Sequence, residues 1–137
     1  MLLHRFVSVV VVALLLAVIV PNLAHATKAE DKTMTKEVLN EAEAKFDAFE
    51  AIAKEWKKAP QGSAEADVLV QKGSDALAVL ESYVQEKLAV FESREAWYAQ
   101  QGKDYKQGLD FMKNNIKKLK GYLDAAKDTE FYQNLNP

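Results

Sequence analysis

The sequence predicts an all-α protein, in which an N-terminal signal peptide is followed by an up-down-up bundle of three long helices. Three observations carry this prediction. After residue 26 the chain is rich in Ala, Lys, Glu, Leu and Gln, and its apolar residues recur in steps of three and four. Glycine and proline are scarce and mark two short stretches that suit turns. No stretch of strand length alternates between apolar and polar residues.

The first 26 residues predict a signal peptide. Residues 6–20 form an apolar run of 15 residues, broken only by Ser8, whereas a membrane-spanning helix needs about 20. Pro21 then breaks the helix, and the sequence AHA ending at Ala26 offers the small residues that a signal peptidase accepts. We therefore expect cleavage after Ala26 and export to the periplasm or the extracellular space. The alternative is an uncleaved N-terminal anchor.

Cleavage leaves a single domain, residues 27–137. The loss of Arg5 reduces the 18 Lys and Arg to 17, against 20 Asp and Glu, so the net charge is −3. This mildly acidic balance gives no overall attraction to nucleic acid or to anionic lipid. The chain has no cysteine and can form no disulfide, so its stability must come from apolar burial, for which a chain of about 110 residues suffices.

The first helix is expected to span about 28 residues and to end before Pro60, because proline cannot continue a helix. The stretch KAPQGSAE, residues 58–65, predicts a turn, in which Ser63 can cap the next helix by accepting from a free backbone N–H. The apolar residues of this first helix recur in steps of four and three: Val38, Ala42, Phe46, Phe49, Ala53 and Trp56.

The second helix is expected to run for about 27 residues from Ser74. Residues 64–72 either extend it or form a short separate helix, because Gly73 weakens a helix interior. The apolar residues of each helix that recur in steps of three and four form its seam, and Glu95 fills one position of the seam of this helix. We expect Glu95 to form an ion pair at the edge of the core, with Arg94 as its neighbour. The alternative is a buried acid with a raised pKa. The other seam residues are Leu77, Leu80, Val84, Leu88, Phe91 and Tyr98.

The third helix, of about 24 residues, is expected after a turn at Gly102, which suits a left-handed cap. Its apolar positions alternate strictly in steps of four and three, a pattern that favours coiled-coil-like packing at shallow crossing angles. Residues 128–137 follow as a C-terminal tail that either folds back on the bundle or docks on a partner. The seam consists of Tyr105, Leu109, Met112, Ile116, Leu119, Leu123 and Ala126.

The sequence carries no catalytic, metal-binding or cofactor-binding motif. Both histidines, His4 and His25, lie in the predicted signal peptide, so the mature chain has neither His nor Cys. This excludes the usual ligands of haem, zinc and di-iron sites and the usual base of a nucleophilic triad. Acid pairs such as Glu37 and Glu41 are typical of a solvated helix face. We therefore expect no catalytic residue, no metal, no cofactor and no enzymatic activity.

A basic stripe on the third helix is the candidate partner-binding surface. It lies one residue after the seam, and five of its seven positions are lysine: Lys106, Lys113, Lys117, Lys120 and Lys127. The second helix is acidic, so the stripe either pairs with that helix when the bundle packs or remains free for an acidic partner. Four aromatic residues complete the candidate set: Phe111, Tyr122, Phe131 and Tyr132.

These features predict a non-enzymatic exported accessory protein that docks on a larger protein or complex. The alternative is a carrier or sensor of a small apolar ligand held between the helices, since 12 of the 13 aromatic residues lie after residue 26. A protein partner is expected, whereas nucleic acid and stable membrane insertion after cleavage are not. Self-association into a homo-oligomer is open.

Overall fold

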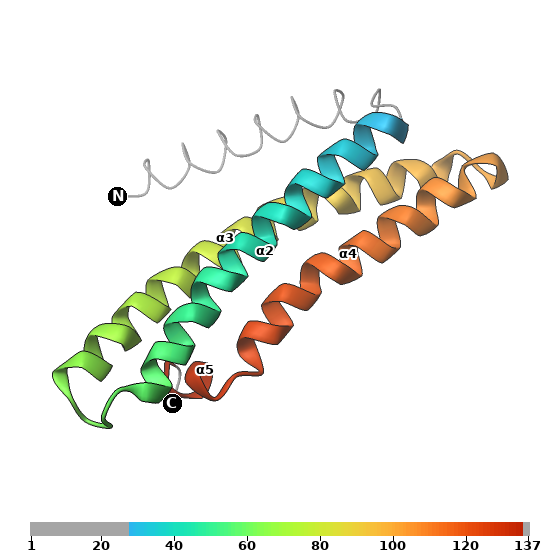
Figure 1. The fold of residues 1–137 in the computed structure, drawn as a ribbon. Coiled ribbons are helices and arrows are strands. Elements are labelled where there is room, and N and C mark those ends of the chain that lie inside the picture. The colour runs from blue at the N-terminus through green and yellow to red at the C-terminus, as the bar shows by residue number, and fades with distance from the viewer. Residues whose placement is uncertain (1–27, 136–137) are drawn as a thin grey trace, which may run out of the picture.

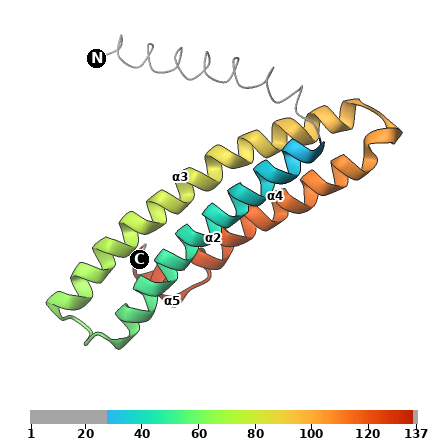
Figure 2. The ribbon, with the colours of Figure 1, turned by 45° about the horizontal axis from the view of Figure 1, so that its top comes forward.

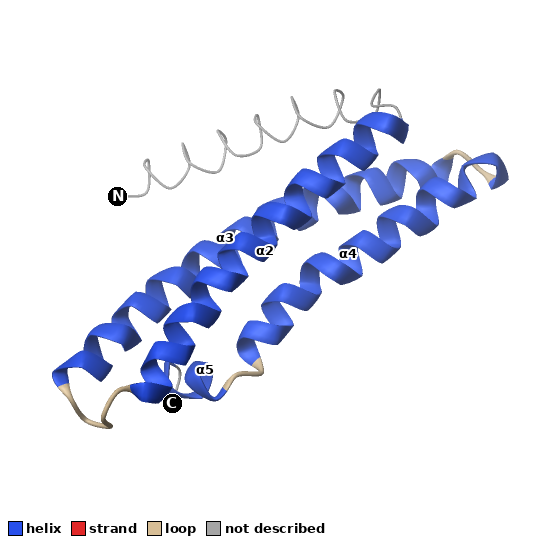
Figure 3. Ribbon diagram, viewed as in Figure 1, coloured by secondary structure: helices blue, strands red, loops and turns tan. Residues whose placement is uncertain are grey.

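The computed structural model describes residues 28–135, which form a bundle of three long helices and one short helix (Figure 1). The helices are α2 (Lys28–Lys58), α3 (Ala64–Gln100), α4 (Lys106–Lys127) and α5 (Glu130–Leu135), and a single 3-10 turn, η1 (Lys103–Tyr105), precedes α4. No strand occurs in this part of the chain (Figure 3). The predicted all-α bundle is confirmed. The predicted signal peptide and its cleavage position lie outside the described residues.

The turn between α2 and α3 has the predicted chemistry. Ser63 caps α3, because its hydroxyl oxygen accepts a hydrogen bond from the backbone N–H of Ala66 at 3.1 Å. Gly62, one residue earlier, has a φ of 74°, a backbone conformation that residues with a Cβ rarely adopt. This short connection brings α3 back along α2, as the up-down topology requires.

α3 is one continuous helix of 37 residues, so residues 64–72 extend the second helix and form no separate element. Gly73, which the sequence offered as a point of division, is buried inside this helix. A Cβ at Gly73 would overlap the Phe131 ring. Gly73 therefore lets an aromatic side chain pack directly against the helix backbone, and it does not interrupt the helix.

The C-terminal tail folds back and closes one end of the bundle. α4 has 22 residues and is much shorter than α3, and α5 lies at the end that α4 does not reach (Figure 2). Phe131 is fully buried there, with its ring centroid 5.6 Å from that of Phe49 and 5.3 Å from that of Trp56. Of the two alternatives for residues 128–137, the structure therefore shows the docked one up to Leu135.

A single apolar core runs along the three long helices and reaches α5. Apolar residues on one face of each helix supply it, which is the source of the stability of a chain without disulfides. Within residues 28–135, no helix is both long and apolar enough to cross a bilayer. The fully buried apolar side chains are Ala42, Phe49, Leu80, Val84, Phe91, Met112, Leu119, Ala126 and Phe131.

Candidate functional site

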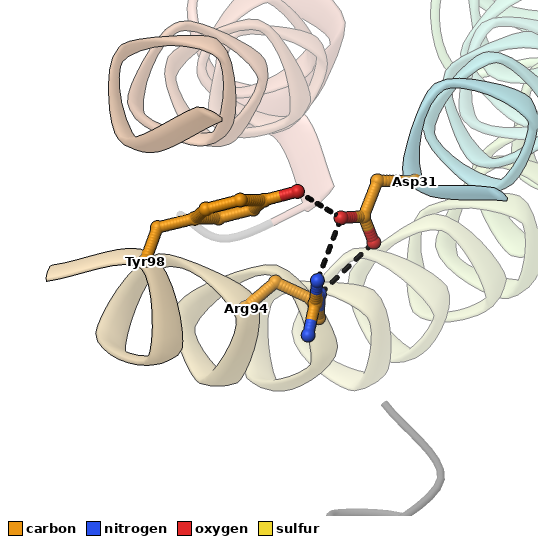
Figure 4. A network of polar contacts seen from close by, with 3 residues as sticks. All are labelled: Asp31, Arg94 and Tyr98. Carbon is orange, nitrogen blue, oxygen red and sulfur yellow. Dashed lines mark hydrogen bonds and ion pairs between the residues drawn. The ribbon is translucent and has the colours of Figure 1, made fainter. Parts of the chain in front are cut away.

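Two charged residues lie in the core at the end of the bundle opposite α5. Arg94 of α3 is 0% exposed and Asp31 of α2 is 1% exposed. The Arg94 guanidinium donates to both carboxylate oxygens, from Nε to Oδ1 at 2.9 Å and from Nη2 to Oδ2 at 2.8 Å (Figure 4). The Tyr98 hydroxyl donates to the same carboxylate. These three side chains join the first turn of α2 to the last turns of α3. We call them the Asp31 network.

Glu95 lies at the edge of the core, as expected, but no ion pair found within residues 28–135 includes it. Arg94 occupies the buried position between Phe91 and Tyr98, whereas Glu95 is only half-buried. The buried ion pair of the described chain therefore joins Arg94 to Asp31. A helix has 3.6 residues per turn, so residues 94 and 95 both fit the spacing, and the seam pattern alone could not decide between them.

Aromatic rings enclose the Arg94 guanidinium. Its central carbon lies 4.5 Å from the Trp97 ring centroid and 5.0 Å from the Tyr98 ring centroid, distances at which cation–π attraction operates. Burial alone lowers the pKa of Arg94, but the hydrogen bond and the charge of Asp31 outweigh it, so the net shift is upward. The guanidinium thus stays charged, and its charge compensates that of the buried carboxylate.

The pKa of Tyr98 is raised by burial and then by its hydrogen bond to Asp31. Burial, together with nearby carboxylates, also raises the pKa values of Tyr83 and Tyr122. The unfolded chain therefore releases these phenolic protons at a lower pH than the folded chain does. We expect the free energy of unfolding contributed by these groups to be constant below about pH 10 and to fall above it.

This expectation is checked by denaturant unfolding at a series of pH values, with tyrosinate absorbance recorded in parallel. Tyr98→Phe removes one of the three groups and should make the decline above about pH 10 shallower. A marked fall in stability from tyrosine ionisation already near pH 8 would contradict the raised pKa values.

A groove lies between α2 and α4 beside the Asp31 network. It consists of two hollows of about 220 and 230 Å³ that share Lys32 and Phe111. The larger is lined further by Thr35, Lys36, Leu39, Asn40 and Asn115. The smaller is lined further by Lys28, Asp31, Tyr98, Gln107 and Gly108. We call the two hollows together the α2/α4 groove.

One polar group in the α2/α4 groove has no hydrogen-bond partner among the described residues. It is the hydroxyl of Thr35, a residue only 2% exposed. Across the groove, Asn115 is 5% exposed and donates from Nδ2 to the backbone oxygen of Phe111 at 2.7 Å. A buried hydroxyl without a hydrogen-bond partner costs about 1–3 kcal/mol. The Thr35 hydroxyl therefore lowers the free energy of unfolding of the bundle.

The five stripe lysines, Lys106, Lys113, Lys117, Lys120 and Lys127, are all exposed on α4. No ion pair found within residues 28–135 includes any of them; those present are Glu41–Lys45, Glu50–Lys54, Glu86–Lys87 and Asp31–Arg94. The alternative in which the stripe pairs with the acids of α3 therefore has no support in the described contacts.

The four candidate aromatic residues do not join the stripe. Phe111 lines the α2/α4 groove, and the Tyr122 ring centroid lies 6.1 Å from that of Phe46 on α2. Lys113 follows Phe111 by two residues, about 200° around the helix, and so lies on the other side of α4. Phe131 is fully buried and Tyr132 packs half-buried against the core. Phe131 therefore cannot contact a partner while α5 is docked, which corrects that part of the expectation.

Among residues 28–135, no group of three or more His, Cys, Asp or Glu side chains is placed to hold a metal ion. Comparison with protein-family models, with curated proteins and with solved structures finds no match for this chain. Sequence reasoning missed the Asp31 network and the α2/α4 groove. The signal for the first was Asp31 itself, which with Thr35 continues the apolar seam of α2 backwards from Val38 in steps of three and four.

Proposed function

We propose that this protein is a non-enzymatic accessory protein that works outside the cytoplasm and docks on the acidic surface of a larger protein. The lysine stripe of α4 is the docking surface. The observation that carries the proposal is that these lysines are exposed and that none takes part in an ion pair within the described bundle. The apolar run of residues 6–20 and the motif ending at Ala26 support export.

The stripe has a cost that docking would relieve. Lys113, Lys117 and Lys120 follow one another in steps of four and three, so their charges are neighbours on the helix surface. Like charges at these spacings destabilise a helix by about 0.2–0.5 kcal/mol per pair. An acidic partner surface would neutralise them and would also accelerate association by electrostatic steering. The helix keeps the backbone positions of the three lysines on one face, so the partner has only their side chains to order.

Charge reversal tests this docking surface. Lys113→Glu/Lys117→Glu/Lys120→Glu should weaken binding to the partner more than tenfold, and raising the salt concentration should weaken wild-type binding in the same way. The partner is first captured from an extract of the source organism with the mature protein as bait. It is then purified, and its affinity for each variant is measured by surface plasmon resonance.

The matched control is Lys57→Glu/Lys58→Glu/Lys72→Glu, which has the same net charge but alters exposed lysines of α2 and α3 that likewise make no ion pair found within residues 28–135. This control should bind the purified partner within a few-fold of wild type. Equal binding by wild type and by the α4 variant would reject the stripe as the docking surface. Binding to anionic vesicles in place of a protein, or self-association detected by light scattering, would reject the acidic protein partner.

A further inference from the structure

We infer that the α2/α4 groove is a binding site for an amphipathic carboxylate, with the carboxylate at Thr35 and the apolar part along Phe111. The inference does not depend on docking through α4, because the stripe and the groove lie on different sides of that helix. Four features of the groove lead to it: its length, its charge, the unpaired hydroxyl and its apolar wall.

The groove has the dimensions of a site for an elongated small molecule. Its lining on α2 extends from Lys28 to Asn40, which at 1.5 Å per residue is about 18 Å. The two hollows of about 220 and 230 Å³ share Lys32 and Phe111 in their linings and so lie next to each other. Joined, they fall in the range of about 300–1,000 Å³ that is usual for small-molecule sites.

The charge of the groove selects an anion. Lys28, Lys32 and Lys36 recur every four residues along one rim and are all exposed. The one acid in the lining is Asp31, and Arg94 already compensates its charge through two hydrogen bonds. Three lysines therefore line the groove, and its lining residues include no free carboxylate to oppose them.

The Thr35 hydroxyl fixes where the anionic group would lie. This hydroxyl has no partner in the described chain, and it lies between Lys32 and Lys36 in sequence, in the hollow that both lysines line. The hydroxyl itself is buried, so a carboxylate would reach it only after the side chains that cover it move aside, and the carboxylate would then accept from it beside Lys32 and Lys36. Such charge-assisted hydrogen bonds are stronger than neutral ones. A ligand of this kind satisfies the polar group that the folded protein leaves unsatisfied.

The apolar part of the ligand would cross Phe111 into the second hollow. Its floor there includes Tyr98 and Gly108. Gly108 has no side chain, and a Cβ at that position would overlap the Tyr98 ring, so the glycine allows the ring to lie against α4. The Tyr98 ring is held through its hydroxyl by Asp31 and is only 2% exposed, so the apolar surface left for a chain or an aromatic group comes mainly from the half-buried Phe111.

Isothermal titration calorimetry with three probes of equal chain length tests the ligand class. Dodecanoate, below its micelle concentration, should bind the purified protein at one site and at least tenfold more tightly than dodecanol or dodecyltrimethylammonium. Saturable binding of dodecanoate with this preference supports the inference. An absence of dodecanoate binding, or equal binding of the three probes, would overturn it.

Thr35→Val tests the position of the carboxylate. The substitution keeps the shape of the side chain and removes the hydroxyl, so dodecanoate affinity should fall about tenfold while the melting temperature of the free protein rises. Thr33→Val is the matched control, because the Thr33 hydroxyl is exposed and donates to the backbone oxygen of Ala29 at 3.1 Å. It should leave dodecanoate affinity unchanged. Wild-type affinity in Thr35→Val would overturn the assignment.

Lys32→Gln gives a second test that keeps the fold, because Lys32 is exposed and makes no ion pair within residues 28–135. Dodecanoate affinity should fall about tenfold and dodecanol affinity should not change. Lys57→Gln, at the other end of α2, is the control and should bind as wild type does. An equal loss in both lysine variants would show a non-specific charge effect and would overturn the site.

Discussion

Replacing Arg94 with methionine is expected to lower the free energy of unfolding by about 3–5 kcal/mol. Methionine keeps most of the side-chain volume, so the loss is expected to come from the Asp31 carboxylate, which is 1% exposed in the wild-type fold and would lose its countercharge there. The Tyr98 hydroxyl alone cannot replace two charge-assisted hydrogen bonds. Guanidinium chloride unfolding followed by circular dichroism measures the change.

A double substitution separates the ion pair from the burial of its members. Asp31→Leu alone should also destabilise the bundle, because it leaves the guanidinium buried and uncompensated. Arg94→Met/Asp31→Leu removes both charges, and its stability should return to within about 1–2 kcal/mol of wild type. Two single effects that simply add would contradict a direct Asp31–Arg94 interaction. The exposed pair Glu41–Lys45 is the control, and Glu41→Gln should cost less than about 1 kcal/mol.

Replacing Phe131 with alanine is expected to cost about 3–5 kcal/mol, the usual range for removing a fully buried phenylalanine. The Phe131 ring contacts Phe49 and Trp56 of α2 and packs against α3 at Gly73. Its loss therefore leaves a cavity between α2, α3 and α5. Chemical denaturation gives the value. A change below about 1 kcal/mol would show that α5 is not docked in solution.

Gly73→Ala tests the same contact from the other side. In a helix interior this substitution normally stabilises by about 1 kcal/mol, but here the new methyl group overlaps the Phe131 ring and the sign should reverse. Gly121 of α4 is the matched control, because no atom lies within 4 Å of a Cβ built there, and Gly121→Ala should stabilise. In the Phe131→Ala background, Gly73→Ala should cease to destabilise, since the ring that it meets is gone.

Much of this fold is predictable because helical periodicity and capping are local properties. The three long helices, the Ser63 cap and the turn before α3 all follow from residues within a few positions of one another. Gly73 shows the limit of local reasoning. Its neighbours in sequence suggest a division of the helix, whereas its actual role is set by a ring 58 residues later in the chain.

The burial of Asp31 and Arg94 is harder to predict. A seam is recognised from apolar residues at helical spacing, so a charged residue at a seam position is read as an exposed one. Arg94 could have been preferred over Glu95 on chemical grounds. It is the one arginine after residue 26, and its planar fork suits a buried, bidentate pair better than other cations do. Choosing its partner requires knowing that the first turn of α2 lies beside the last turns of α3, which depends on the axial register of the two helices.

The α2/α4 groove cannot be read from either helix alone. Lys28, Lys32 and Lys36 form a visible i, i+4 row, but that row is ordinary on an exposed helix face. Only the packed structure places Phe111 and Asn115 opposite it and shows that the Thr35 hydroxyl lacks a partner. The lysine stripe of α4 was predictable as a pattern, and the structure adds that its charges make no ion pair with α3 in the described chain.

The Asp31–Arg94 and Gly73–Phe131 contacts join residues 63 and 58 positions apart, in a bundle whose other contacts are mostly local. Local contacts make helical bundles fold quickly, because little loop entropy is lost before they form. The two distant contacts can close only after neighbouring helices have paired, so they should be absent from the transition state for folding. Variants at these positions should then unfold faster while refolding at nearly the wild-type rate. The two contacts, one at each end of the bundle, would thus set the rate at which the native state unfolds.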